Sequence, residues 1–574
     1  MKIIIPKILN MRRTFKTSPN REIVLKLITE INVSEKTATL LAQRGIETFS
    51  QAKAFFRPTL DDLHNPYLMK DMDNAVNRIE KAIVENENIL VFGDYDVDGT
   101  TAVALVYSYL KNIYSNVETY IPDRYIEGYG ISYKGIDFAH DNSFTLIIAL
   151  DCGIKSIEHI DYANQKNIDF IICDHHLPDD SLPNAIAVLD PKRKDCPYPY
   201  KELSGCGIGF KLIQALAHNR KKTVQDLLPY LDLVATAIAA DIVPITGENR
   251  VLAYFGLQVI NALPRAGIKA LIQNIKKKKL SISDVVFIIA PRINAAGRIK
   301  HGNEAVKLLT EMNFSQAEIF AEEIEKYNLE RRELDQQITI EAIEQIKENN
   351  EQQNYTTVVY HPNWHKGVIG IVASRLIESF YRPTVVFTKS GEKLAASARS
   401  VKDFDIYQAL ENCAKHLEQF GGHKYAAGMT LLEENYPAFK NEFEAYVKKT
   451  IPKEILEPEM VIDQIIDFTD INKKFISILK QFEPFGPENM TPIFMTKNVY
   501  DTGFVKTIGK NNEHLKMFLK QNNKISFSAI GFNLANYIKQ VSNSKPFHII
   551  YTIQENEFNG KITYQLNVKD IIFI

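Results

Sequence analysis

A chain of 574 residues is too long to fold around one hydrophobic core, so we expect three or four domains. Hydrophobic residues make up 45% and charged residues 24%, which is typical of a globular protein and excludes a disordered or fibrous one. The net charge of −2 lacks the basic surplus common in nucleic-acid-binding proteins, so a polyanion would need a local basic site or a metal centre.

The sequence carries no targeting signal that we can identify. No apolar run is long enough to cross a bilayer, and residues 1–20 lack the apolar centre of a secretory signal. The five cysteines form no CxxC pair, which fits a reducing compartment. We therefore expect a cytoplasmic protein with no membrane partner.

The N-terminal part differs in pattern from the next 240 residues. Helix-like segments at 21–30 and 36–44 predict a small helical cap over residues 1–70. From 71 to 312, predicted strands and helices alternate, which indicates an α/β domain with a mainly parallel sheet.

Acidic residues follow the first predicted strand of that domain, at 88–92. Asp94, Asp96 and Asp98 occupy alternate positions just before a helix predicted over 100–113. Ligands of open α/β sheets bind at the carboxyl ends of strands. Three carboxylates crowded there need a compensating cation, although such a turn taken alone is also typical of a solvated loop.

Two further predicted strands, 144–150 and 168–173, end in the same way. Asp151 follows the first, Asp174, His175 and His176 follow the second, and Asp241 closes a helix-like run at 227–240. Carboxylates and imidazoles without a thiolate cluster favour Mn²⁺ or Mg²⁺ over structural zinc. The coincidence of these residues at one sheet edge predicts a centre for two divalent cations.

A long amphipathic helix is expected after residue 312. Ser315 and Glu318 resemble a capping box, and apolar residues recur to Glu348. At 1.5 Å per residue this helix, within residues 313–350, would be about 50 Å long and would join two domains.

The rest of the chain predicts two more domains. Residues 351–451 alternate again between strands and helices and indicate a second α/β domain. Residues 452–574 are rich in short β runs, with turns at Asn522–Asn523 and Asn559–Gly560, and predict a five-stranded barrel. We expect most of Phe504, Phe518 and Phe527 to lie in its core rather than to stack on a nucleic acid.

Several motifs in this order resemble a known group of enzymes. GDYDVDG at 93–99, DCG at 151–153, DHH at 174–176 and AADIVP at 239–244 resemble the four motifs of the DHH phosphoesterase superfamily. WHKGVIGIVASR at 364–375, SARS at 397–400, GGH at 421–423 and EPFGPEN at 483–489 resemble the RecJ family of single-strand-specific 5′-to-3′ DNA exonucleases. The resemblance covers about residues 70–500 and implies a DHH domain, a DHH-associated domain and an OB-fold, with a role in DNA repair and recombination.

The resemblance also implies roles at the centre. One cation would be bound by Asp96 and the other by Asp98 and His175, with Asp151 bridging both and Asp241 completing the set. Asp94 would orient a water molecule or a basic partner, and His176 would touch the scissile phosphate or donate a proton.

An exonuclease that starts at a 5′ end must recognise that end, and a terminal phosphate calls for arginines and backbone amides. By resemblance the DNA and 5′-phosphate ligands would come from both α/β domains: Arg124, Arg292, Arg298, Ser397, Arg399, Gly421, Gly422 and His423. Arg292 and Arg298 flank a predicted loop at 294–297. Each arginine taken alone is also typical of a surface ion pair.

Two alternatives remain open at this point. A DHH phosphoesterase could act on short oligonucleotides, nucleotide signals or pyrophosphate, and a catalytically inactive relative could serve as a DNA-binding scaffold. The extra barrel argues for a longer polymer, and the intact acids argue for activity. The resemblance further implies single-stranded DNA, a helicase and a single-strand-binding protein as partners of a monomer. Asp190, Glu488 and Met490 depart from the family pattern.

Overall fold

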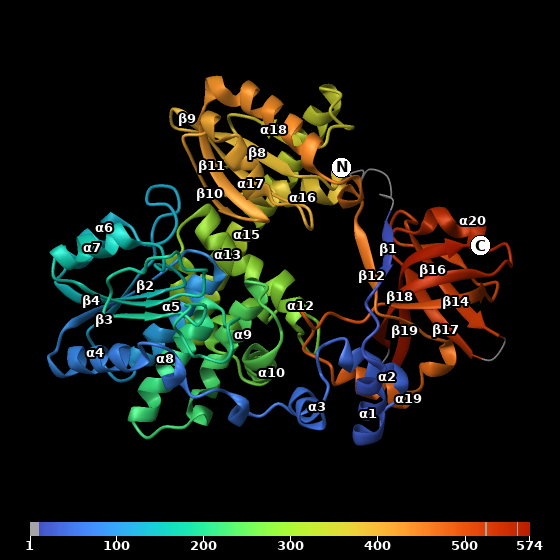
Figure 1. The fold of residues 1–574 in the computed structure, drawn as a ribbon, viewed down its shortest axis with the longest axis horizontal. Coiled ribbons are helices and arrows are strands. Elements are labelled where there is room, and N and C mark those ends of the chain that lie inside the picture. Colours follow the sequence, from blue (N-terminus) through green and yellow to red (C-terminus); the bar gives the residue numbers. More distant parts are fainter. Residues whose placement is uncertain (1–10, 523–524, 559–560) are drawn as a thin grey trace.

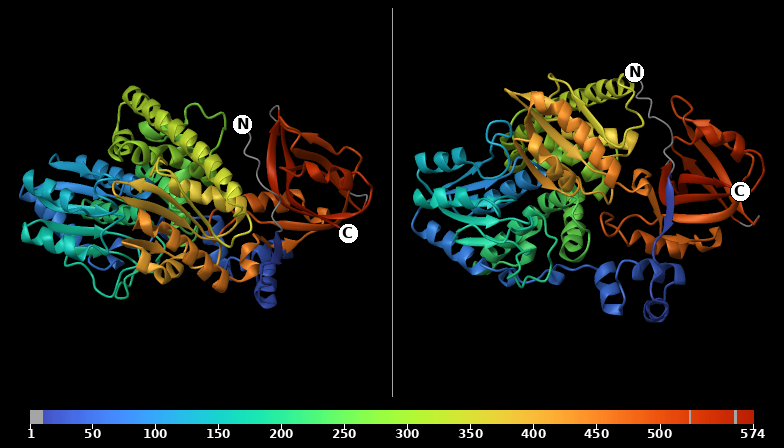
Figure 2. Two further views of the ribbon diagram at one scale, coloured as in Figure 1. Left: turned by 90° about the horizontal axis from the view of Figure 1, so that it is seen from above. Right: turned by 45° about the horizontal axis from the view of Figure 1, so that its top comes forward.

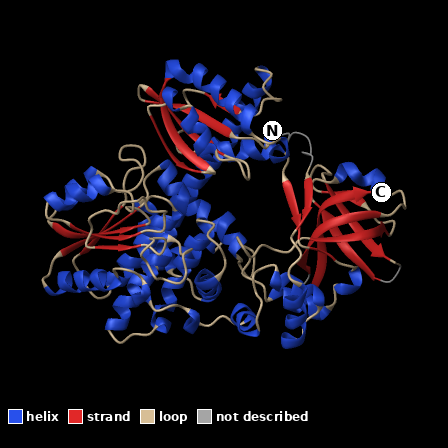
Figure 3. Ribbon diagram, viewed as in Figure 1, coloured by secondary structure: helices blue, strands red, loops and turns tan. Residues whose placement is uncertain are grey.

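The computed structural model describes residues 11–522, 525–558 and 561–574. Asn523 and the whole predicted turn at Asn559–Gly560 lie outside these residues. Within the described part, the strands form two five-stranded sheets, one seven-stranded sheet and one strand pair. The two α/β domains and the barrel surround a central gap between the ribbons (Figures 1 and 3).

The first domain has the predicted parallel sheet. Its strands lie in the order β3 (Val117–Tyr120), β2 (Asn88–Gly93), β4 (Phe144–Leu150), β5 (Asp169–Cys173) and β6 (Ala187–Leu189). All four pairings are parallel, so the carboxyl ends of the strands meet at one edge. The apolar runs that predict these strands are buried on both faces, as a parallel sheet covered by helices requires.

Helices surround this sheet. The four longest are α4 (Met72–Val84), α5 (Val97–Lys111), α8 (Gly205–Asn219) and α10 (Gly247–Ala262). The shorter ones are α6 (Tyr133–Asp141), α7 (Ile157–Gln165), α9 (Leu231–Ala240), α11 (Ala266–Ile272), α12 (Ile282–Asp284), α13 (Ala290–Ile299) and α14 (Asn303–Thr310). The helix predicted from residue 100 begins at Val97, because the Asp96 side chain caps it by accepting the Gly99 N–H at 3.0 Å. The run predicted as one helix at 227–240 begins as a 3₁₀ turn that contains Pro229.

Two local predictions in this part were wrong. Residues 294–297 are not a loop but lie inside α13, where Gly297 allows close packing: a Cβ there would stand 2.6 Å from the Tyr95 carbonyl. The capping box at Ser315 and Glu318 does not form, because α15 begins at Phe314 and both residues lie inside the helix. Its cap is Asn313, whose side chain accepts the Gln316 N–H at 3.1 Å.

The predicted long helix is present as α15 (Phe314–Glu348) and connects the two α/β domains (Figure 2). The second domain has the strand order β10 (Gln419–His423), β11 (Ala426–Leu432), β9 (Lys393–Arg399), β8 (Thr384–Ser390) and β7 (Thr357–Tyr360). Helices α15 and α16 (Ile369–Phe380) pack on one face of this sheet. Helices α17 (Ile406–Asn412) and α18 (Tyr436–Thr450) pack on the other.

The predicted barrel is confirmed. Five strands close on themselves: β14 (Phe494–Asp501), β16 (His514–Gln521), β17 (Ile525–Gly531), β19 (Lys561–Phe573) and β18 (Phe547–Phe558). Strands β13 (Gln464–Ile465) and β15 (Lys506–Ile508) extend the sheet, and α20 (Ile538–Val541) lies between β17 and β18 in the chain.

The core prediction for the barrel aromatics holds only for Phe527, which packs against the core and against the Phe468 ring at 5.2 Å. It is wrong for Phe504, which is 70% exposed, and for Phe518, which is 41% exposed. Phe518 lies between the buried Met517 and Leu519 on β16, so strand alternation turns it outward.

The N-terminal segment packs on the barrel. Helices α1 (Arg21–Ile31) and α2 (Glu35–Ala42) share a core with α19 (Lys473–Lys480) and the barrel strands, and α3 (Phe49–Phe56) lies next to them. Strand β1 (Arg12–Phe15) pairs in parallel with β12 (Glu459–Ile462), so both ends of the chain contribute to one module (Figure 1).

Among the described residues, no single helix has the length and apolar composition of a membrane span. Helices α10 and α11 meet that test only as a pair, with a bend of 72° between them.

Candidate metal centre

The sheet edge gathers the acids and the histidine that the sequence singles out. Asp94 and Asp96 follow β2, Asp151 follows β4, and His175 follows β5. Two helices supply the remaining acids: Asp98 stands in the first turn of α5 and Asp241 at the C-cap of α9.

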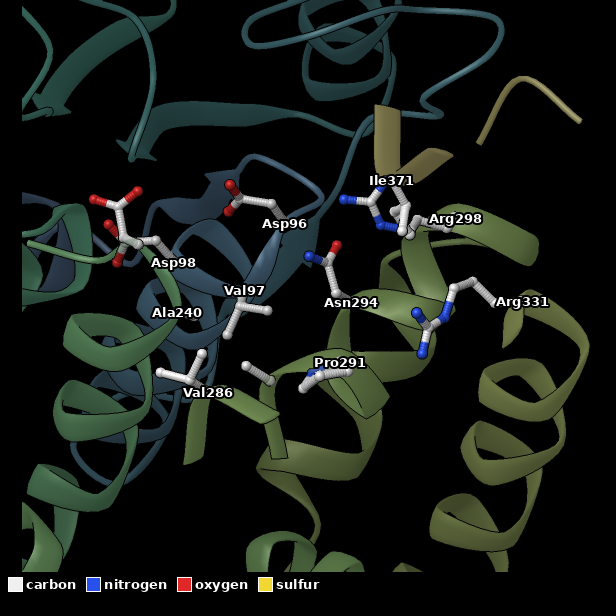
Figure 4. Close-up of a pocket in the computed structure, with 12 residues that line it drawn as sticks. Asp96, Val97, Asp98, Ala240, Val286, Pro291, Asn294, Arg298, Arg331 and Ile371 are labelled. Carbon is white, nitrogen blue, oxygen red and sulfur yellow. The ribbon is translucent and has the colours of Figure 1, made fainter. Parts of the chain in front are cut away.

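Four of these side chains point at the same small volume. The His175 Nε2 atom lies 3.2 Å from Asp151 Oδ1, 3.6 Å from Asp241 Oδ2 and 3.9 Å from Asp98 Oδ2. Asp96 is not in this tight group, but it lines the same cavity as Asp98 and Asp241 (Figure 4).

The start of α8 holds two of these acids in place. The backbone N–H groups of Gly205 and Cys206 donate to the Asp98 carboxylate at 2.7 and 2.8 Å. Gly205 also leaves room for Asp151, because a Cβ at Gly205 would stand 2.7 Å from Asp151 Oδ1. A helix N-terminus thus orients the metal-competent oxygens of two distant segments.

The acids repel one another. Burial and the nearby charge of Asp96 raise the pKa of Asp98 to about 7. Burial and the charges of Asp98 and Asp96 raise the pKa of Asp241 to about 8. Burial, with neighbouring acids, raises the pKa of Asp94 and of Asp151 well above the ordinary value. Burial, helped by the charge of His176, lowers the pKa of His175 to about 3, so the imidazole is neutral and available as a ligand.

The donor set fits divalent cations. Asp151 Oδ1 and His175 Nδ1 are buried without a hydrogen-bond partner, and so is Asp94 Oδ2. Buried acceptors left unpaired are costly, and a cation bound by Asp151 Oδ1 would remove this cost at that atom and offset the repulsion among the acids. Carboxylate oxygens with one imidazole are ligands that suit Mn²⁺ or Mg²⁺.

Asp94 lies outside the tight group, whereas a ring nitrogen of His176 lies within 4.8 Å of ligand atoms of Asp151 and His175. Asp94 accepts the Gly130 N–H through Oδ1 at 3.4 Å. The Nδ1 atom of His176 lies 2.7 Å from Asp174, and its Nε2 lies 3.4 Å from the Tyr129 hydroxyl. Burial disfavours the charged His176 ring, but the Asp174 hydrogen bond and charge outweigh this and raise the pKa of His176 to about 9.

A cluster of arginines lies beside the acids. Arg124 stacks over the Tyr95 ring at 4.8 Å, Arg298 donates to the Gly367 carbonyl at 2.9 Å, and Arg399 donates to Ser397 Oγ at 3.1 Å. Burial and the charges of Arg124, Arg399 and Arg331 lower the pKa of Arg298 to about 9. Mutual repulsion of this kind marks the cluster as a site for an anion.

The cavity between the acids and the arginines encloses about 250 Å³ (Figure 4). Asp96, Asp98 and Asp241 line one side, and Asn294, Arg298 and Arg331 line the other. Arg331 comes from α15 and was not singled out from the sequence. In the described part of the chain, no carboxylate lies within ion-pair distance of Arg124, Arg298, Arg331 or Arg399.

The other predicted phosphate ligands are placed differently. Arg292 forms an ion pair with Glu325 at 2.6 Å, the alternative that the sequence left open. Gly421, Gly422 and His423 lie on β10, and a Cβ at Gly422 would stand 2.4 Å from the Ala426 carbonyl. Burial and the charges of Arg399 and His176 lower the pKa of His423, so the β10 edge lies near both clusters.

Asp190, a departure from the family pattern, lies at the same sheet edge. It is fully buried at the end of β6, and its Oδ2 has no hydrogen-bond partner. Burial raises the pKa of Asp190 to about 7.

Comparisons with known proteins agree with this geometry. The sequence matches the DHH family N-terminal domain over residues 88–238, the DHHA1 domain over 352–449 and the RecJ OB domain over 462–570. It is 35% identical over 562 residues to the single-stranded-DNA-specific exonuclease RecJ of Bacillus subtilis, covering 96% of this chain and 70% of that protein. It is also 32% identical over 558 residues to the Escherichia coli protein of the same name, and this match covers 93% of this chain and 95% of that protein.

Solved structures show the same fold. The crystal structure of RecJ in complex with Mn²⁺ from Thermus thermophilus matches with a TM-score of 0.84 and 24% identity, over 98% of this chain and 80% of that one. A crystal structure of exonuclease RecJ bound to manganese matches with a TM-score of 0.60 and 31% identity, over 69% of this chain and 97% of that one. With the DHH motifs, the DHHA1 domain and the OB barrel all in place, this chain belongs to the RecJ family.

Proposed function

We propose that this protein is an exonuclease that hydrolyses single-stranded DNA from the 5′ end with two divalent cations, Mn²⁺ or Mg²⁺. The observation that carries the proposal is the convergence of Asp98, Asp151, His175 and Asp241 beside a cluster of arginines that form no ion pair with a carboxylate among the described residues. The names of the relatives support the substrate, and the intact acids argue against an inactive scaffold.

The metal ligands would be Asp96, Asp98, Asp151, His175 and Asp241, and Asp151 would help to hold both cations. When bound, two cations supply a nucleophile at neutral pH and neutralise the charge that develops on the phosphate. Asp94 lies outside this set, and its buried, unpaired Oδ2 would orient a water molecule.

His176 would act on the phosphate rather than on a metal. Asp174 accepts the Nδ1 proton of His176 and raises the pKa of the ring to about 9, so the charged ring also carries a proton on Nε2, which lies 3.4 Å from the Tyr129 hydroxyl. That proton can stabilise a phosphate oxygen or pass to the leaving 3′-oxygen.

The arginine cluster would hold the 5′-terminal phosphate. Arg124, Arg298 and Arg399 supply charge-assisted donors, and Ser397 and the β10 backbone at Gly421 and Gly422, with His423, line the same side. Arg292 would have to release Glu325 before it could take part. A fixed site for the terminal phosphate next to the metals would make the enzyme start at an end.

The wider architecture suggests how the strand is selected. We assign residues 1–70 to an N-terminal cap, 71–312 to the DHH domain, 313–350 to the connecting helix, 351–451 to the DHH-associated domain and 452–574 to the OB-fold. The space between two domains joined by one helix would exclude a duplex, and the exposed Phe504 and Phe518 offer rings for base stacking. We infer a cytoplasmic monomer that acts with a helicase and a single-strand-binding protein in DNA repair and recombination.

One assay tests the proposal. Single-stranded DNA labelled at the 5′ or the 3′ end is incubated with the protein and Mn²⁺, Mg²⁺ or EDTA. We expect immediate release of the 5′ label as a mononucleotide, late loss of the 3′ label, no cleavage in EDTA and little cleavage of a blunt duplex. Release from the 3′ end first would contradict the polarity.

A further inference from the structure

A second pocket lies at the end of the sheet edge away from Arg124, because the strand order β3-β2-β4-β5-β6 places Arg124, after β3, and Lys192, after β6, at opposite ends of that edge. It measures about 550 Å³ and is lined by Leu177, Lys192, Arg193, Lys194, Lys201 and Glu202. Leu177 directly follows His176, and Lys192 stands just after β6, which pairs with the strand that carries His175. The pocket therefore lies at the same sheet edge as the acids.

The lysines of the pocket make only weak or few interactions with other residues. Lys192 lies 4.0 Å from the half-exposed Glu202, and the Lys194 pair with Asp180 has side chains that are 92% and 99% exposed. Exposed pairs of this kind contribute little free energy. Lys201 donates one hydrogen bond, to the Cys196 carbonyl at 2.8 Å, and an ammonium has three donors.

Arg193 holds in place the loop that carries Lys192 and Lys194. Arg193 is buried and pairs with Asp71 at 2.6 Å and with Asp195 at 2.8 Å. It also donates to the Val188 carbonyl at 2.6 Å. Arg193 therefore anchors the loop, while its neighbours on either side, Lys192 and Lys194, remain on the pocket wall.

We infer that this pocket binds a backbone phosphate of the DNA strand on the 3′ side of the bond that is cleaved. The inference rests on the proposed function. If the terminal phosphate lies among the arginines beyond Asp96, and the scissile phosphate lies at the acids, the strand continues past His175 and Asp241 toward Lys192. Leu177, which is 70% exposed, offers an apolar surface for the sugar or base that accompanies this phosphate.

The inference predicts a dependence on substrate length. A 5′-phosphorylated dinucleotide has only the terminal and the scissile phosphates, whereas a trinucleotide adds the one that would reach the pocket. In Lys192→Gln, we expect KM to rise about tenfold for the trinucleotide and a decanucleotide, and clearly less for the dinucleotide. The slope of log KM against log salt should fall by about 0.7 for the longer strands, as loss of one phosphate contact predicts.

Three further variants complete the test. Lys192→Arg keeps the charge and should restore most of the affinity, and Lys194→Gln, on an exposed side chain, should raise KM in the same length-dependent way without affecting folding. Lys81→Gln is the matched control, because Lys81 lies on α4 in an exposed pair with Glu85. It should behave as the wild type.

The outcomes separate the two proposals. Equal losses on all three substrates, or no loss on any, would overturn the phosphate pocket while leaving the exonuclease intact. Failure of the wild-type protein to degrade any of the strands would instead refute the proposed function.

Discussion

At the scale of single residues, the centre is defined by strain as well as by charge. Asp151 has a positive φ of 59°, unusual for a residue other than glycine, and its Oδ1 has no hydrogen-bond partner. Backbone strain and unpaired polar atoms are retained where function requires them. We interpret both as the cost of placing one oxygen where two cations can share it.

Replacement of Asp151 by Asn tests this interpretation. Asparagine tolerates the left-handed conformation, so the backbone should be preserved. We expect cleavage to fall on the order of a thousandfold, since the ligand that we propose to be shared by both cations is lost. The metal-free protein should melt at a higher temperature than the wild type because one repelling charge is gone, and the thermal shift caused by Mn²⁺ should shrink. Normal turnover in D151N would refute the bridging role.

Arg399 tests the phosphate site. In Arg399→Ala, we expect kcat/KM to fall at least about tenfold on a 5′-phosphorylated strand, and much less on the same strand with a 5′-hydroxyl. Arg399→Lys should give an intermediate loss, because a point charge cannot replace the arginine fork. Equal losses on both strands would argue against a site for the terminal phosphate.

At the scale of elements, the first turn of α8 controls the centre. Its backbone N–H groups fix Asp98, and its first glycine touches Asp151. The sequence pattern predicts the acids but not this helix start, because a glycine before an apolar helix has no signature of its own.

Alanine substitutions at Gly205 and Gly207 test whether the start of α8 positions the Asp151 carboxylate. In Gly205→Ala the new methyl group would stand 2.6 Å from the Asp151 Cβ, so the carboxylate must move. We expect weakened Mn²⁺ binding, measured by calorimetry, and a loss of cleavage of at least about a hundredfold. Gly207→Ala is the matched control, since its nearest neighbour is at 3.4 Å. It should keep activity and gain up to about 1 kcal/mol of helix stability. Similar behaviour of both variants would contradict this role for Gly205.

The sequence predicts which acids and histidines meet at the sheet edge, but not which side chains from other elements face them. Asp94, Asp151 and His175 could be placed together because parallel strands bring their carboxyl ends to one edge. Arg331 could not, because an arginine on a long polar helix looks like any solvated side chain until the fold turns it toward Asp96 and Asp98. The exposed Phe518 was misplaced because the outward face of a strand depends on register, which short apolar runs do not define.

At the scale of the whole molecule, Arg250 on α10 joins three parts of the chain. Its buried guanidinium donates to the carbonyls of Phe55 in α3 and of residues 481–484 before the barrel, and it stacks over the Phe55 ring at 3.8 Å. Ile245, four residues after Asp241, donates its N–H to the Pro487 carbonyl at 2.9 Å. Such contacts across hundreds of residues have no local sequence signal.

Replacement of Arg250 by Met should loosen this junction. The substitution leaves several buried carbonyls without a donor, at a cost of about 3 kcal/mol. We expect a lower melting temperature and faster hydrogen exchange in residues 481–489, whereas Mn²⁺ binding persists. Arg57→Met is the control, because the exposed Arg57 reaches the same segment through one bond to Gln481 at 2.7 Å. Unchanged exchange in R250M would show that the junction does not depend on this residue.

The central claim is that acids and one histidine from separate segments hold two cations. The most direct measurement is an anomalous difference map from a crystal soaked in Mn²⁺. We predict two peaks at the carboxyl edge of the first sheet, in contact with Asp96, Asp98, Asp151, His175 and Asp241. A map without peaks there, or with manganese bound elsewhere, would contradict it.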